Sequence, residues 1–261
     1  MDSIKQALEL ARSSAHGGVA SDLKEALVDE KIKTVQLSPA YLDSKRIVAH
    51  GAGPQGRYYD MLRTQVLQEM DDNGWQFLAV TSATAGCGKS VTSCNLAVSI
   101  ARLTERSVLL VDMDMQKPKV TEYLGIRGHE GLLSVLNGEA GLARVMVQAS
   151  IGRSKLLVLP GEAFKSDTAE WMASQSMTSL LQILKREFRS RVVIFDMPPM
   201  LVGDDVISVL PQMDAVLLVA GIGQTSVSDI KECHKHLKTT PVVRVLVNRV
   251  TEESNAYYGY Y

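Results

Sequence analysis

The sequence predicts a doubly wound α/β fold, in which a mostly parallel sheet carries helices on both faces. From Trp75 onward, short apolar runs alternate with segments of helical periodicity. Within each run the hydrophobic residues are continuous, which is typical of parallel strands that are covered on both faces. The expected strands are Phe77–Val80, Val108–Val111, Leu156–Leu159, Val192–Phe195, Ala215–Val219 and Val242–Val247.

The chain before the first expected strand predicts helices separated by irregular structure. Residues 1–15 and a short stretch after Ser21 have apolar stripes at helical spacing. Residues 33–56 end in a run rich in glycine and are expected to be irregular, and a stronger helix follows over 57–72. We therefore expect an N-terminal extension and linker (1–56), a main domain (57–250) and a flexible tail (251–261).

Length and composition exclude several classes of protein. The chain has 261 residues, of which 46% are hydrophobic, and a net charge of −1. This argues against disorder and against nucleic-acid binding through global charge. No apolar run reaches the ~18 to 20 residues that cross a bilayer, and three cysteines are too few for a disulfide framework. We expect a cytoplasmic protein that binds no nucleic acid.

A phosphate-binding loop follows the first expected strand. Gly86–Ser90 reads Gly-x-Gly-Lys-Ser and leads directly into a helix, while Ala83 replaces the usual first glycine. Small residues let backbone N–H groups point at a phosphate, the lysine reaches the outer phosphates, and the serine can bind Mg²⁺. The residues expected to bind the nucleotide are Ala85, Gly86, Cys87, Gly88, Lys89, Ser90 and Val91.

Carboxylates stand at the ends of two further strands. Asp112 and Asp114 follow the second strand, and Asp196 ends the fourth, before two prolines. Carboxylates in such places can hold Mg²⁺ or accept a hydroxyl proton. Because ligands of doubly wound sheets bind at the carboxyl ends of strands, we expect all three beside the loop. Asp204 and Asp205 come next, and either can cap the following helix instead.

Together, these motifs resemble the bacterial tyrosine kinases, which are P-loop NTPases of MinD/ParA-like fold. The match is close to the CpsD/CapB-like cytoplasmic autokinases of exopolysaccharide biosynthesis, which are associated with chain-length determinants. Segments elsewhere also look like parts of this family: Leu42–Ala49, Met61–Leu67, Gly131–Leu136 and Leu156–Gly161. At the C-terminus, four tyrosines resemble its phosphoacceptor cluster: Tyr257, Tyr258, Tyr260 and Tyr261.

The resemblance implies an ATP- and Mg²⁺-dependent tyrosine autokinase that phosphorylates this tail in trans and regulates exopolysaccharide synthesis, export and chain length. Lys89 would bind phosphates. Asp112 and Asp114 would form a second motif, one of them helping to deprotonate the acceptor tyrosine. Ser90, Asp112 and Asp196 would bind the metal ion.

Asn248, which ends the last expected strand, would read the adenine edge, although a turn residue is equally compatible with its position. The resemblance also implies a membrane-anchored polysaccharide co-polymerase as activator, a homo-oligomer, a tyrosine phosphatase as a further partner, and a peripheral location at the inner membrane. The family's oligomerisation helix carries Glu-x-x-Arg-x-x-Arg, where this chain has Arg57, Asp60 and Arg63. The first two charges are reversed, and Arg57 and Asp60 can pair along their own helix instead.

Two alternatives stay open on the sequence. A ParA/MinD-like ATPase switch usually has a lysine where Thr84 stands here, and the tyrosine tail also argues against it. A regulatory scaffold that binds nucleotide without kinase activity is compatible with Ala85 and Cys87, where the kinases usually have proline and an acidic residue.

Overall fold

The computed structural model describes residues 32–49, 54–164, 168–189 and 191–250. The helices expected within residues 1–15 and after Ser21 lie outside the described residues, as does the tail over 251–261 with its four tyrosines. Those expectations stay predictions.

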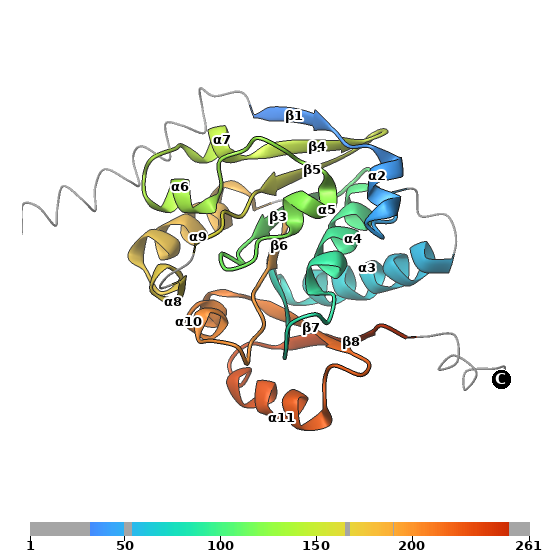
Figure 1. The fold of residues 1–261 in the computed structure, drawn as a ribbon, viewed down its shortest axis with the longest axis vertical. Coiled ribbons are helices and arrows are strands. Elements are labelled where there is room, and N and C mark those ends of the chain that lie inside the picture. The colour runs from blue at the N-terminus through green and yellow to red at the C-terminus, as the bar shows by residue number, and fades with distance from the viewer. Residues whose placement is uncertain (1–31, 50–53, 165–167, 190, 251–261) are drawn as a thin grey trace, which may run out of the picture.

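Within the described residues, eight strands form one sheet at the centre of the molecule (Figure 1). The strands are β1 (Lys33–Gln36), β2 (Phe77–Ser82), β3 (Ser107–Asp112), β4 (Val147–Ile151), β5 (Ser154–Leu159), β6 (Arg191–Asp196), β7 (Ala215–Gly221) and β8 (Val242–Asn248). Their spatial order is β1-β4-β5-β3-β6-β2-β7-β8, with β4 antiparallel to β5 and parallel to β1. All six strands expected from apolar runs are confirmed.

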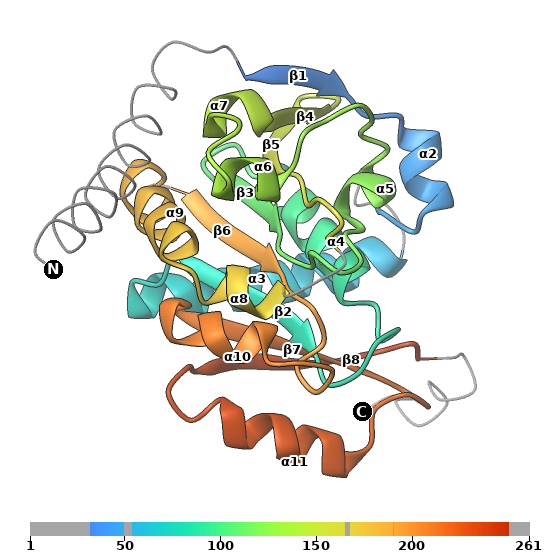
Figure 2. The ribbon, with the colours of Figure 1, turned by 60° about the vertical axis from the view of Figure 1, so that its left-hand side comes forward.

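Helices cover both faces of the sheet, so the predicted doubly wound architecture is confirmed. One face packs against α2 (Pro39–Ser44), α3 (Pro54–Asn73), α4 (Lys89–Ala101) and α5 (Val120–Leu124). The other face packs against α6 (Leu132–Leu136), α7 (Leu142–Val145), α8 (Thr168–Met172), α9 (Gln175–Glu187), α10 (Asp205–Val209) and α11 (Val227–His236). Figure 2 shows the two helical layers on either side of the sheet.

The expectation of irregular structure over residues 33–56 was wrong where β1, α2 and the start of α3 form, whereas residues 50–53 lie outside the described residues. β1 pairs with β4 at the edge of the sheet, and Ser38 begins α2 by accepting a hydrogen bond from the backbone N–H of Tyr41. Pro54 begins α3 three residues before the expected start, at a position where proline is well tolerated. The division of the chain at residue 57 stays a prediction, although β1 belongs to the sheet.

Helix α3 is fastened to α4 through Asp60. Its carboxylate accepts hydrogen bonds from Arg63, Ser99 and Arg102. Asp60 therefore pairs with Arg63 and Arg102, and the expected pairing of Arg57 with Asp60 along α3 was wrong. This contact fixes α3 against the helix whose first turn carries the phosphate-loop lysine.

Candidate nucleotide-binding and catalytic site

The loop between β2 and α4 depends on glycine for its shape. Gly86 and Gly88 have φ values of 80° and 90°, in the left-handed region that favours glycine. A Cβ atom on Gly88 would lie 2.3 Å from Nδ2 of Asn248, so this position is also sterically closed. Ala83 is fully buried and has no positive φ, which explains why the usual glycine is dispensable there. The loop is followed directly by the N-terminus of α4, where free backbone N–H groups can bind an anion.

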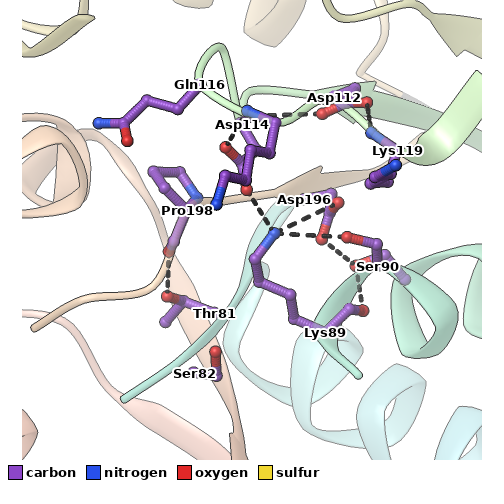
Figure 3. A network of polar contacts seen from close by, with 12 residues as sticks. Thr81, Ser82, Lys89, Ser90, Asp112, Asp114, Gln116, Lys119, Asp196 and Pro198 are labelled. Carbon is purple, nitrogen blue, oxygen red and sulfur yellow. Dashed lines mark hydrogen bonds and ion pairs between the residues drawn. The ribbon is translucent and has the colours of Figure 1, made fainter. Parts of the chain in front are cut away.

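Lys89 is the first residue of α4, and its amine lies among carboxylates (Figure 3). Nζ donates to Oδ2 of Asp114 at 2.7 Å and to the hydroxyl of Ser90 at 3.3 Å, and it lies 3.8 Å from Oδ2 of Asp196. Burial lowers the pKa of the Lys89 amine, but the charges of Asp196 and Asp114 raise this pKa by more. The amine therefore stays protonated at neutral pH and can bind a phosphate.

Asp114 and Asp196 flank this amine, and Asp112 lies opposite Asp196 in the register of β3 and β6. Asp112 and Asp196 are fully buried, and Asp114 is 4% exposed. Burial raises the pKa of Asp112 well above its usual range, and the charge of Asp196 adds to this effect. Burial likewise raises the pKa of Asp196, while the Lys89 amine offsets part of the shift. Negative charge is thus held here at an energetic cost that an added cation would reduce.

Asp112 also organises the chain that follows β3. Its Oδ2 accepts the backbone N–H groups of Lys119 and Val120, each at 3.0 Å, and its Oδ1 accepts the N–H of Asp114 at 3.2 Å. One carboxylate therefore fixes the turn that carries Asp114 and the start of α5. A carboxylate oxygen can accept two hydrogen bonds, so Oδ1 keeps one acceptor position.

The donor set fits a magnesium ion. Ser93 donates to Oδ1 of Asp196 at 3.0 Å, but Oδ2 of this buried carboxylate accepts no hydrogen bond from the described residues. A buried oxygen without a donor is unfavourable, and a cation would satisfy it. Mg²⁺ prefers oxygen ligands and is commonly bound by one or two carboxylates together with substrate phosphates. Asp196 and the hydroxyl of Ser90 would hold it, directly or through water.

Asn248 lies against the phosphate loop. Its side-chain Nδ2 donates to the carbonyl oxygen of Cys87 at 2.9 Å, and its backbone carbonyl oxygen accepts a hydrogen bond from the N–H of Ile222. The side chain therefore braces the loop, and the adenine-reading role stays a prediction. Cys87 is buried, with its sulfur near the hydroxyls of Thr84 and Thr225 at 3.5 and 3.3 Å.

Sequence reasoning missed a polar group beside the site. Nε2 of Gln116 donates to Oγ1 of Thr168 at 3.2 Å and to Oδ2 of Asp205 at 3.4 Å. These residues lie in, or shortly after, the connections that follow β3, β5 and β6, which are neighbours in the sheet. Asp205 is 5% exposed, its Oδ1 has no partner among the described residues, and neither it nor Asp204 caps α10 through its side chain. The apolar pattern around Asp205 could have indicated burial, but nothing in the sequence identified its partner.

Comparison with known proteins bears on this geometry. Residues 78–258 match the family described as the CobQ/CobB/MinD/ParA nucleotide binding domain, which is well over half of the chain. The chain belongs to this family. The predicted P-loop fold of MinD/ParA type is thereby confirmed, and with it the capacity to bind a nucleotide.

Relatives within the family carry the names of tyrosine kinases. The tyrosine-protein kinase YwqD of Bacillus subtilis is 30% identical over 78% of this chain and 84% of its own length. The putative tyrosine-protein kinase EpsB of Ralstonia nicotianae is 28% identical over 95% of this chain. These matches confirm the predicted membership in the bacterial tyrosine kinases. The chain spans about a third of the length of that EpsB protein, at 34%.

Solved structures agree on the fold. The chimerical protein CapA2B2 superposes with a TM-score of 0.71 at 21% identity, covering 89% of this chain and all of that chain. The kinase domain of the Escherichia coli tyrosine kinase ETK gives a TM-score of 0.67 at 21% identity, covering 88% of this chain and 95% of its own. In the part of the chain that the structure describes, no helix is long and apolar enough to cross a membrane.

Proposed function

We propose that this protein is an ATP- and Mg²⁺-dependent tyrosine autokinase that transfers the γ-phosphate of ATP to Tyr257, Tyr258, Tyr260 and Tyr261. Its location is cytoplasmic, and its biological role is control of exopolysaccharide synthesis, export and chain length. The names of the relatives, which are tyrosine-protein kinases, support the kinase activity. The observation that carries the proposal is the buried Lys89 amine, held between Asp114 and Asp196 at the end of a phosphate loop.

Each residue of the cluster has a chemical task in the proposed reaction. Lys89 and the loop N–H groups neutralise the phosphates, and Mg²⁺ held by Ser90 and Asp196 supplies further charge neutralisation in the transfer. A phenol has a pKa near ~10, so it needs a base at neutral pH. Asp112 is the better candidate, because its Oδ1 has acceptor capacity left, whereas Asp114 pairs with Lys89. The phenol proton passes to Asp112, the phenol oxygen bonds to the γ-phosphorus, and ADP leaves.

The proposal is tested by mass spectrometry of the tail. After incubation with ATP and Mg²⁺, and with an activator segment if one is needed, residues 257–261 should gain phosphate. Lys89→Met should abolish labelling, whereas Lys235→Met, which changes an exposed lysine on α11, should not. Asp112→Asn should slow transfer by about 10²- to 10⁴-fold, the usual contribution of a general base. Nucleotide binding without any gain in mass would contradict the proposal.

Transfer between chains is tested by mixing two variants. The acceptor is Lys89→Met with an intact tail, and the donor has all four tail tyrosines changed to phenylalanine. Phosphate on the acceptor tail supports transfer in trans. Labelling that occurs only within intact chains, at a rate independent of protein concentration, would contradict it.

A nucleotide-hydrolysing switch is the second candidate, because the matching family includes MinD and ParA. Thr84 stands where such proteins usually carry a lysine, and its hydroxyl donates to the carbonyl of Gln224 instead. Rapid ATP hydrolysis stimulated by lipid or DNA, without protein phosphorylation, would favour the switch. A regulatory scaffold would bind nucleotide and show neither activity.

The proposed partners extend the kinase hypothesis. We expect ATP and ADP as ligands, a second copy of the chain, a membrane-anchored polysaccharide co-polymerase as activator, and a tyrosine phosphatase that resets the tail. Through the activator the protein would lie at the inner membrane. Failure of the activator's cytoplasmic segment to co-purify with the chain, or to change its kinase rate, would remove that partner.

A further inference from the structure

Arg249 directly follows β8 and has features that the cluster around Lys89 does not use. It is exposed, and it is one of the few residues other than glycine with a positive φ, at 62°. Its side chain makes no hydrogen bond and no ion pair with the described residues. Arg244, on the same strand, instead pairs with Glu69 at 3.0 Å. A left-handed arginine is sterically unfavourable, which points to a local requirement.

The side chain of Arg249 lies along the phosphate loop. A Cβ atom on Gly86 would be 3.8 Å from Nη2 of Arg249 and 3.7 Å from Oε1 of Gln224. A Cβ atom on Gly221 would be 3.5 Å from Cδ of Arg249. The aliphatic part of the arginine is therefore close to the end of β7, and its guanidinium is beside the loop, across Gly86 from the Gln224 amide.

The neighbouring contact shows which side of the loop this is. Asn248, the residue before Arg249, bonds to the carbonyl oxygen of Cys87. Phosphates bind on the N–H side of such a loop, because carbonyl oxygens repel them. Arg249 thus lies beside the cradle rather than inside it. A nucleotide group that reaches it must extend out of the cradle, and in ATP or ADP that group is the nucleoside.

We propose that Arg249 is a nucleoside-binding residue, whose guanidinium stacks on the purine base of the bound nucleotide. A guanidinium is planar, permanently charged and weakly hydrated, so it stacks well on an aromatic face. The left-handed backbone of Arg249 and the bond from Asn248 to the loop hold this cation in place beside Gly86. The inference rests on the nucleotide-binding part of the proposed function and not on phosphate transfer.

The test is isothermal titration calorimetry of the full chain with ADP and, separately, with pyrophosphate. Stacking of this kind is worth about 1–2 kcal/mol, so Arg249→Ala should weaken ADP binding about 5- to 30-fold. Pyrophosphate has no base, and its binding should stay within about twofold of wild type, below the ~0.5 kcal/mol that ordinary surface changes produce. The matched control Arg244→Ala should change neither affinity.

Arg249→Gly keeps the test valid if the alanine variant folds poorly, because glycine adopts the left-handed conformation without strain. It should lose ADP affinity as alanine does, with unchanged or higher thermal stability. Equal weakening for ADP and pyrophosphate would show a phosphate contact and overturn the proposal, as would an unchanged ADP affinity. A chain that shows the expected ADP pattern but phosphorylates no tyrosine would overturn the proposed function alone.

Discussion

Replacing Gly88 by alanine should destabilise the ligand-free protein by two separable effects. Its φ of 90° costs an alanine about 1–2 kcal/mol. The new Cβ would lie 2.3 Å from Nδ2 of Asn248, so this side chain must move and give up its bond to Cys87, which is worth about 1 kcal/mol. The expected loss is about 2–3 kcal/mol, or roughly 4 to 12 °C in the unfolding midpoint.

Urea unfolding of four proteins separates the two effects: wild type, Gly88→Ala, Asn248→Ala and the double variant. Asn248→Ala removes both the bond and the obstacle, so Gly88→Ala should then cost only the backbone strain. The coupling energy of the cycle should be about 1 kcal/mol. Gly74→Ala is the matched control, because Gly74 has a φ of 65° and a Cβ atom there would meet nothing within 4 Å. An equal cost of Gly88→Ala in both backgrounds would refute the claim that Asn248 limits this position.

Three further changes test contacts around the site. Asp196→Asn should raise the stability of the ligand-free protein at neutral pH and abolish Mg²⁺-dependent nucleotide binding, measured by thermal shift and calorimetry. Since burial raises the pKa of Asp196, wild-type stability should fall as pH rises above about 3.8 through that folded pKa, and the variant should flatten this decline in urea unfolding. Gln116→Arg should raise the unfolding midpoint by pairing with Asp205, a buried carboxylate whose Oδ1 has no partner among the described residues. Asp60→Ala should lower stability by about 1–3 kcal/mol, because it leaves the part-buried Arg102 without its carboxylate partner.

Each of these changes has its own control. Asp214→Asn alters a carboxylate that accepts the N–H groups of Gln76 and Phe77, at the end of β2 opposite the phosphate loop. Its pKa is lowered rather than raised, so this change should not flatten the decline above about 3.8. Gln116→Lys separates charge from the geometry of the guanidinium. Arg106 pairs with the exposed Asp71, so Asp71→Ala should change stability by less than about 1 kcal/mol. A loss for Asp60→Ala no larger than for Asp71→Ala, or no gain from Gln116→Arg, would contradict the respective prediction.

Among the six predicted strands, β8 is a half-exposed edge strand that is interrupted by Arg244. The other five could be predicted because each is a continuous apolar run that is largely buried. β1 and β4 could not. β1 reads Lys-Thr-Val-Gln and is largely exposed at the sheet edge, and β4 contains Gln148 and Ser150. Their pairing depends on tertiary contacts, such as β4 on β5, that no local pattern encodes.

The candidate site was predictable where the chemistry follows a strand end. Lys89 contacts Asp114 and Asp196, and Asp112 lies opposite Asp196, because parallel strands place their carboxyl ends at one edge of the sheet. The partners of Asp205 were not predictable, since Gln116 lies 89 residues away along the chain. Likewise, Asp60 pairs with Arg102 rather than with the expected Arg57, and this pairing depends on how α3 packs on α4.

The crowding of acids around Lys89 has a consequence for protein engineering. With three buried carboxylates and one amine, the ligand-free fold is less stable than the same fold with one acid made neutral. Selection for heat resistance alone would therefore enrich chains that have lost an acidic group here, and under the proposed function such chains would not transfer phosphate. Screening in the presence of Mg²⁺ and nucleotide would reverse that bias, because bound ligand would stabilise only the chains that keep all three acids.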